Sequence, residues 1–200
     1  MKRLLNIIFI MLLMVAVPTA RATYLLVPMD ETQRNHLKAY GIAYYALQHD
    51  VEVTWLLNYR GGAFMMKYAD AIEREARLRG VSVEAIADGQ STAILSEIAD
   101  ASVNMDAVRL QKAPKIAVYS PKTKLPWDDA VTLVMTYAEI PYDVIYDEEV
   151  VAGILPTYDW LHLHHEDFTG QYGKFWGNYR NAQWYIEDVR DQEAGAQKLG

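Results

Sequence analysis

The chain has 200 residues, of which 52% are hydrophobic and none is cysteine, so burial must stabilise its core without disulfide bonds. Its 26 acidic residues outnumber its 19 basic ones, and the formal net charge is −7. An acidic chain without a basic stripe repels phosphate backbones, which argues against nucleic acid as a partner.

The first 22 residues have the pattern of a secretory signal peptide. Lys2 and Arg3 precede an apolar run over residues 4–17, and Pro18 ends that run. The small residues of Ala20-Arg21-Ala22 then match a cleavage site. Because a membrane span needs about 20 apolar residues, a retained anchor is the weaker alternative. We therefore expect cleavage after Ala22, a periplasmic or secreted protein with no membrane attachment after cleavage, and a mature net charge of −10 from 16 basic and 26 acidic residues.

Beyond residue 22, strand-like and helix-like stretches alternate. Asp30 and Gln33 have the spacing of a variant capping box in front of a helix. The expected strands are residues 24–27, 51–57, 81–87, 116–119, 142–146 and 158–163. Helix-period segments follow them, over about 37–47, 70–80, 92–101, 128–138 and 182–189. This alternation predicts an α/β fold with a mostly parallel, flavodoxin-like open sheet and helices on both faces.

The organisation predicted for the mature chain is an α/β region over residues 23–112 and a second one over residues 113–200. The second begins after a stretch of fading periodicity, with Pro114. Because the sequence ends after a helix without another strand, we expect the second sheet to be incomplete at its C-terminal side.

A histidine and carboxylate cluster follows the last expected strand. Residues 162–167 read His-Leu-His-His-Glu-Asp and hold three of the five histidines. His162 and His164 would share one face of a strand, which suits a single zinc ion, although hydrogen-bonded polar residues at a strand end are the simpler alternative. His164, His165 and Glu166 are the candidate catalytic residues, because ligands bind beyond the carboxyl ends of parallel strands.

Two further groups occupy strand ends and are candidate substrate-binding residues. They are Asn58, Arg60, Gly61 and Gly62 after the second expected strand, and Asp147 after the fifth. Two adjacent glycines allow backbone amides to approach an anion, with a plain turn as the alternative. The acids at 147–149 also suit the first turn of a helix.

The C-terminal segment is rich in aromatic residues and glycine. Three glycines alternate with tyrosine, phenylalanine and tryptophan over residues 168–185. Exposed rings on flexible loops suit glycan stacking or a binding lid, whereas packing over a sheet edge is the structural alternative. A small molecule, a peptide or a glycan is the expected ligand class.

Two pairs of stretches carry a resemblance to a known family. They are NHLKAYG (35–41) with WLLNYRGGAF (55–64), and KIAVY (115–119) with YDWLHLHHEDF (158–168). In these the chain resembles the N-terminal part of exported bacterial proteins commonly labelled asparagine synthetase B. Their sheet resembles the class I glutamine amidotransferase-like fold. The resemblance implies a nucleophilic cysteine on an elbow that would lie beyond Gly200.

The leading hypothesis is therefore an exported amidotransferase-like protein, acting as a hydrolase or as a non-catalytic relative. ATP-dependent asparagine synthesis is not expected, because the chain has neither a cysteine nor an SGGxDS pyrophosphate loop. One alternative is a module that binds cell-surface glycan or peptide through the aromatic segment. Another is a metal-dependent hydrolase that uses His162 and His164.

Export is directly testable. When the full chain is expressed in a Gram-negative host, N-terminal sequencing of the periplasmic product should begin at Thr23, because the cleavage pattern ends at Ala22. A product that remains in the cytoplasm and begins at Met1 would contradict the prediction.

Overall fold

The computed structural model describes residues 22–120, 130–163 and 172–199. The chain forms two compact units. The first contains the described residues up to Arg34 together with Val51–Leu110, and the second contains Asn35–Asp50 and the described residues from Gln111 onward. In the described parts of the chain, no helix is both long and apolar enough to cross a membrane.

The first unit is built on a five-stranded sheet. Its strands are β1 (Tyr24–Val27), β2 (Val53–Leu57), β3 (Ala63–Lys67), β4 (Glu84–Ile86) and β5 (Asp106–Leu110). They are arranged in the order β4-β1-β3-β2-β5, and every neighbouring pair is antiparallel. Since β1 and β2 both pair with β3, and β3 and β4 flank β1, the first four strands have the split β-α-β order of ferredoxin-like folds.

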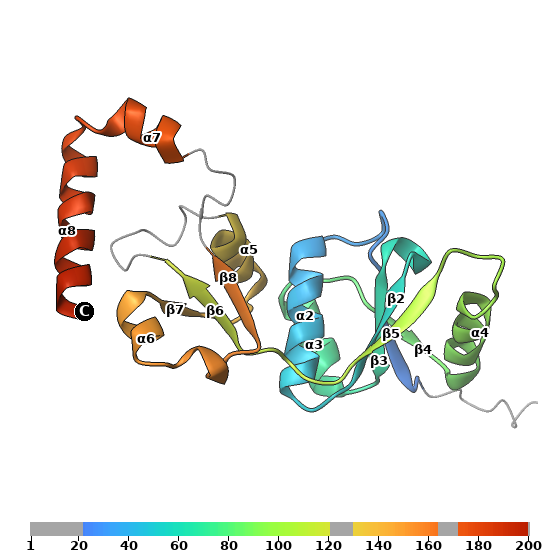
Figure 1. Ribbon diagram of the computed structural model, residues 1–200. Helices are drawn as coiled ribbons and strands as arrows, with labels where there is room; N and C mark the ends of the chain where they lie inside the picture. The colour runs from blue at the N-terminus through green and yellow to red at the C-terminus, as the bar shows by residue number, and fades with distance from the viewer. Residues whose placement is uncertain (1–21, 121–129, 164–171, 200) are drawn as a thin grey trace, which may run out of the picture. The chain divides into compact units, whose positions relative to one another are not determined.

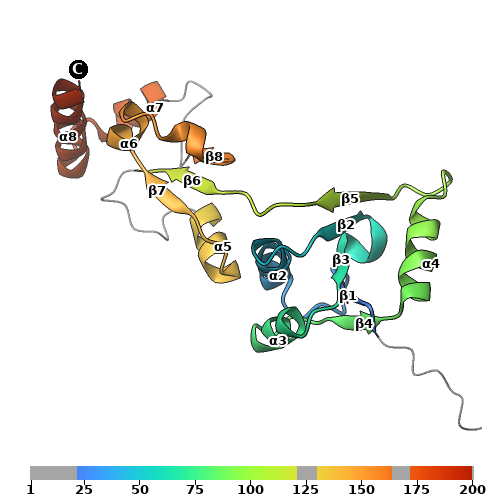
Figure 2. The ribbon, with the colours of Figure 1, turned by 90° about the horizontal axis from the view of Figure 1, so that it is seen from below.

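Helices α3 (Asp70–Leu78) and α4 (Asp88–Ile98) belong to this unit and cover opposite faces of its sheet (Figure 2). One core cluster joins alternate sheet residues such as Leu26, Leu56 and Met65 to Ile94 and Ile98 of α4. Each buried side chain of this size contributes roughly 1.5–3 kcal/mol of transfer free energy. Strand β3 is buried on both faces over its first four residues, as expected of a central strand.

The second unit contains a small parallel sheet (Figure 1). Its strands β6 (Ile116–Tyr119), β7 (Asp143–Ile145) and β8 (Trp160–Leu163) run in the order β7-β6-β8. The remaining elements of the unit are α2 (His36–Gln48), α5 (Ala130–Ala138), α6 (Asp147–Val151), the short 3-10 helix η3 (Leu155–Thr157), α7 (Tyr172–Tyr179) and α8 (Gln183–Leu199). Met135 of α5 packs on Ile116 and Val118 of β6, and the hydroxyl of Tyr44 in α2 donates to the Pro114 carbonyl at 2.7 Å.

The prediction of one mostly parallel, flavodoxin-like or amidotransferase-like open sheet is wrong. Each of the six expected strands overlaps an observed one, but β3 and β5 were not expected. Strand β3 follows β2 through a five-residue loop and therefore pairs with it antiparallel. Among the described strands, only β6, β7 and β8 pair in parallel.

The predicted capping box at Asp30 and Gln33 is also wrong. Asn35 caps α2, where its side-chain oxygen accepts a hydrogen bond from the Lys38 amide at 3.1 Å. Asp30 instead accepts from the Thr32 amide at 3.0 Å, which closes a turn directly after β1.

Candidate functional site

The predicted substrate-binding residues Asn58, Arg60, Gly61 and Gly62 form the loop of the β2–β3 hairpin. All four have positive φ, from 44° at Arg60 to 93° at Gly62, and the short 3-10 helix η1 (Tyr59–Gly61) lies within the loop. The Trp55 indole N–H donates to the Gly62 carbonyl at 3.1 Å and so ties the loop to its own strand. The two glycines therefore allow a tight loop whose backbone has positive φ angles.

Gly61 is also where the hairpin loop approaches the segment that follows β1. A Cβ atom at this position would lie 2.3 Å from the Met29 carbonyl oxygen, which is closer than any side chain can approach. The Met29 amide donates to the Arg60 carbonyl at 3.0 Å across the same contact. Backbone therefore packs directly on backbone here, which only glycine permits.

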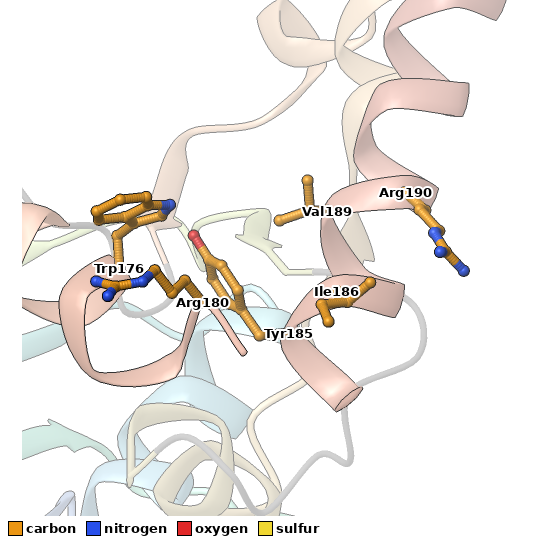
Figure 3. A pocket seen from close by; sticks show the side chains of 6 residues that line it. All are labelled: Trp176, Arg180, Tyr185, Ile186, Val189 and Arg190. Carbon is orange, nitrogen blue, oxygen red and sulfur yellow. The ribbon is translucent and has the colours of Figure 1, made fainter. Parts of the chain in front are cut away.

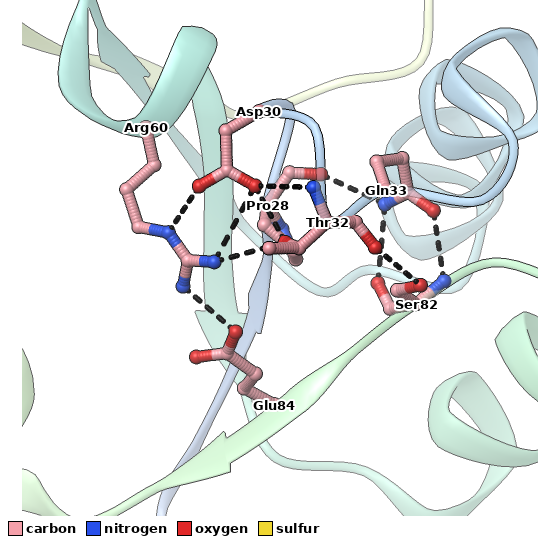
Figure 4. Close-up of polar contacts among 7 residues, drawn as sticks. All are labelled: Pro28, Asp30, Thr32, Gln33, Arg60, Ser82 and Glu84. Carbon is pink, nitrogen blue, oxygen red and sulfur yellow. Dashed lines mark hydrogen bonds and ion pairs between the residues drawn. The ribbon is translucent and has the colours of Figure 1, made fainter.

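The Arg60 side chain lies in a cluster of charged groups at this end of the sheet (Figure 4). Its Nε donates to Asp30 and its Nη1 donates to Glu84, both at 2.7 Å. Its Nη2 donates to the Thr32 hydroxyl at 3.1 Å. The Arg60 side chain is three-quarters buried, and its guanidinium links the β1 end, the hairpin loop and the start of β4. We call Asp30, Thr32, Arg60 and Glu84 the Arg60 cluster.

The charges of the Arg60 cluster shift one another's protonation. Hydrogen bonds from Arg60, and then from Thr32, lower the pKa of the Asp30 carboxyl to about 2 from its ordinary 3.8. The same bonds to Asp30 and Glu84 raise the pKa of Arg60. An anionic substrate would have to compete with two carboxylates for this guanidinium. The arrangement therefore suits a structural clamp more than an anion site.

Gln33 extends this network into the interior. It is almost fully buried, and its Nε2 donates to the Pro28 carbonyl at 2.7 Å and the Ser82 carbonyl at 3.2 Å. Its Oε1 accepts from the Ser82 amide at 2.8 Å. One buried amide thus satisfies three backbone groups of the two loops that flank β1 and β4 (Figure 4).

The predicted catalytic residues His164, His165 and Glu166 lie outside the described residues. His162 is half-buried on β8, where it is the register partner of Val118 on β6. Within residues 22–120, 130–163 and 172–199, no group of three or more histidine and carboxylate side chains is arranged to hold a metal ion. The zinc pair of His162 and His164 stays a prediction.

Asp147 lies at the carboxyl end of the parallel sheet, as the first residue of α6. Its carboxylate accepts a hydrogen bond from the Tyr119 hydroxyl at the end of β6. Because Asn58 and Asp147 follow strands of two different sheets, the expectation that they share the carboxyl edge of one sheet loses its basis.

Four aromatic residues among the described side chains of α7 and α8 form what we call the aromatic strip: Trp176, Tyr179, Trp184 and Tyr185. Trp176, Tyr179 and Trp184 are 51%, 41% and 48% exposed, whereas Tyr185 is buried. The Tyr179 and Trp184 ring centroids are 5.4 Å apart, and Trp184 meets Tyr185 edge to face at 5.7 Å. Tyr179, Trp184 and Tyr185 therefore pack on one another at tilted angles, while Trp176, Tyr179 and Trp184 stay about half exposed to solvent.

A cavity of about 400 Å³ opens beside the strip (Figure 3). It is lined by Trp176, Arg180, Tyr185, Ile186, Val189 and Arg190. The Arg180 guanidinium lies 4.9 Å from the centre of the Trp176 ring, a cation–π contact that holds its position. Sequence analysis singled out these aromatic residues, but it did not predict the cavity or Arg180.

Comparisons of the chain with protein-family models, with curated proteins and with solved structures found no match. The resemblance to the proteins labelled asparagine synthetase B therefore stays a prediction from the sequence.

The close approach at Gly61 yields a stability prediction with a matched control. Gly61 and Gly80 have φ of 79° and 73°, but a Cβ at Gly80 would meet nothing within 4 Å. Gly80→Ala should lower the free energy of unfolding by about 1 kcal/mol through the left-handed backbone alone. Gly61→Ala should lower the free energy of unfolding by at least about 2 kcal/mol more than Gly80→Ala does, because the Met29 backbone would have to move away from the new Cβ atom. If urea denaturation gave the same loss of unfolding free energy for both variants, the result would contradict the close contact between Gly61 and Met29.

The Asp30 pKa predicts how stability depends on pH. Because folding lowers this pKa, the carboxylate stabilises the fold above pH 4, and the contribution is lost as the pH falls toward 2. Asp30→Asn should lower the urea midpoint at pH 6, and the difference from the wild type should shrink between pH 4 and pH 2. A difference that stays constant over this range would contradict the ion pair with Arg60.

Proposed function

We propose that the protein is an exported carbohydrate-binding module whose ligand surface is the aromatic strip and its adjoining cavity. The single observation that carries this proposal is that three large rings of α7 and α8 are about half exposed and that one of them, Trp176, lines an open cavity. Exposed aromatic rings at this density are uncommon on a surface that binds nothing.

The chemistry of the strip favours a sugar. The C–H face of a pyranose ring is flat and apolar, and it packs on an aromatic ring while its hydroxyls stay hydrated. Trp176 and Trp184 offer such faces, and the mutual packing of Tyr179, Trp184 and Tyr185 holds the rings without a ligand. A rigid aromatic surface loses little side-chain entropy on binding, which favours affinity.

Export supports the same proposal. An N-terminal signal peptide would deliver the chain to the compartment in which cell-surface polysaccharides are found. The absence of cysteine agrees with a binding role that requires no thiol nucleophile in these 200 residues.

The hydrolase hypothesis has less support than the binding hypothesis. It assumed that Asn58, Arg60 and Asp147 follow strands of one parallel sheet, and they belong to two sheets. The Arg60 guanidinium is engaged by Asp30 and Glu84. The described residues thus bring together exposed aromatic rings and a cavity on α7 and α8, and we find no catalytic constellation among them.

Binding to an array of immobilised neutral and acidic oligosaccharides tests the proposal. Trp176→Ala should weaken glycan binding at least about tenfold, because it removes a central ring of the surface. Trp160→Ala is the matched control, since Trp160 is 46% exposed but lies on β8, outside the strip. Unchanged binding by Trp176→Ala, or no wild-type binding to any glycan, would contradict the proposal.

A further inference from the structure

The cavity beside the aromatic strip contains a cation placed for contact with a ligand. Arg180 is exposed, follows the last residue of α7 and lies against Trp176 (Figure 3). In the described parts of the chain it has no carboxylate partner, and its side chain makes one long hydrogen bond, of 3.5 Å, to the Gly177 carbonyl. This differs from Arg60, whose guanidinium is occupied by two carboxylates.

The preference for an anion rests on Arg180 and not on the start of α8. Helix α8 has 17 residues and begins at Gln183, whose side-chain amide donates a hydrogen bond to the Glu187 carboxylate at 2.7 Å. A carboxylate therefore already lies at this helix end, where negative charge is favoured. The exposed Arg180 guanidinium, which lines the cavity beside Trp176, is a group that can pair with an anion there.

We infer that the glycan bound by the aromatic strip is acidic, and that the carboxylate of a uronic or sialic-type sugar pairs with Arg180 while the sugar ring packs on Trp176. This inference rests on the proposed carbohydrate-binding function. A planar guanidinium binds a carboxylate through two parallel N–H···O bonds, and the Arg180 guanidinium lies beside the ring on which the sugar would pack.

Because the protein carries a negative net charge, it can bind an acidic ligand only through a local positive group such as Arg180. With a net charge of −7 for the whole sequence, the average field of the protein repels polyanions. An acidic glycan can be retained only if specific short-range pairing outweighs that repulsion. Affinity should therefore depend steeply on the one arginine that contacts the carboxylate.

Arg190 provides a matched control for Arg180. Both arginines line the cavity and both are exposed, but the Arg190 guanidinium is directed away from Trp176 and Tyr185 (Figure 3). Replacing either with glutamine removes the same charge. Only the Arg180 substitution removes the group that lies against the ring.

The test uses one array of acidic oligosaccharides before and after methyl esterification of their carboxylates. Wild-type protein should bind the free acids at least about tenfold more tightly than the esters, because a charge-assisted bidentate pair is lost on esterification. Arg180→Gln should lower affinity for the acids at least about tenfold more than it lowers affinity for the esters. Arg190→Gln should lower affinity for the acids less than about threefold.

The outcomes separate this inference from the proposed function. Equal binding of acids and esters, both lost with Trp176→Ala, would overturn the acidic ligand and leave a neutral glycan-binding module. Equal losses in Arg180→Gln and Arg190→Gln would overturn the direct contact in favour of long-range charge. Tighter binding of an acidic peptide such as hexaglutamate than of any glycan would overturn the sugar assignment itself.

Discussion

The tight hairpin loop between β2 and β3, with its positive backbone φ angles, is the constraint on which the first unit depends. Four residues with positive φ reverse the chain, and β3 then lies at the centre of the sheet between β1 and β2. The backbone contact between Gly61 and Met29 fixes this loop against the end of β1. The antiparallel sheet and the position of the Arg60 guanidinium both follow from that one reversal.

The same reversal explains why a motif that suggests anion binding serves a structural role. The Arg60 side chain leaves the hairpin loop toward the ends of β1 and β4, where Asp30 and Glu84 lie. Ion pairs exposed on a surface contribute little, but the Arg60 side chain is three-quarters buried and its guanidinium joins three segments. Its donors are used to align the sheet end, and the ligand chemistry that we propose lies in the other unit.

The strands with strong apolar patterns could be predicted from the sequence, whereas the topology could not. Residues 24–27 and 116–119 are compact apolar runs, and they form β1 and β6. Strand β3 reads Ala-Phe-Met-Met-Lys directly after two glycines, without the branched residues that mark strands. Strand β5 pairs only with β2 at the sheet edge and is largely exposed, so its alternation is weak. Because β3 and β5 were not predicted, the remaining strands alternated with helices, and that pattern led to the wrong prediction of a parallel sheet.

The candidate site was also only partly predictable, because the sequence displays composition but not the spatial surroundings of a side chain. Composition alone singled out the aromatic segment, because rings at that density are visible in the sequence. The role proposed for Arg180 depends on its distance from Trp176 and on the absence of a carboxylate paired with it among the described residues, neither of which a sequence displays. Arg60 has the same side chain beside two glycines, yet its surroundings give it the opposite role.

The central claim is that ligand binds to α7 and α8 and that the Arg60 hairpin is structural. An NMR titration of the ¹⁵N-labelled protein with an acidic oligosaccharide tests it most directly, because both regions are observed in one experiment. The account predicts saturable shift changes at the Trp176 indole, Arg180 and Tyr185, with residues 58–62 unperturbed. Changes confined to residues 58–62, with the Trp176 indole unmoved, would contradict it.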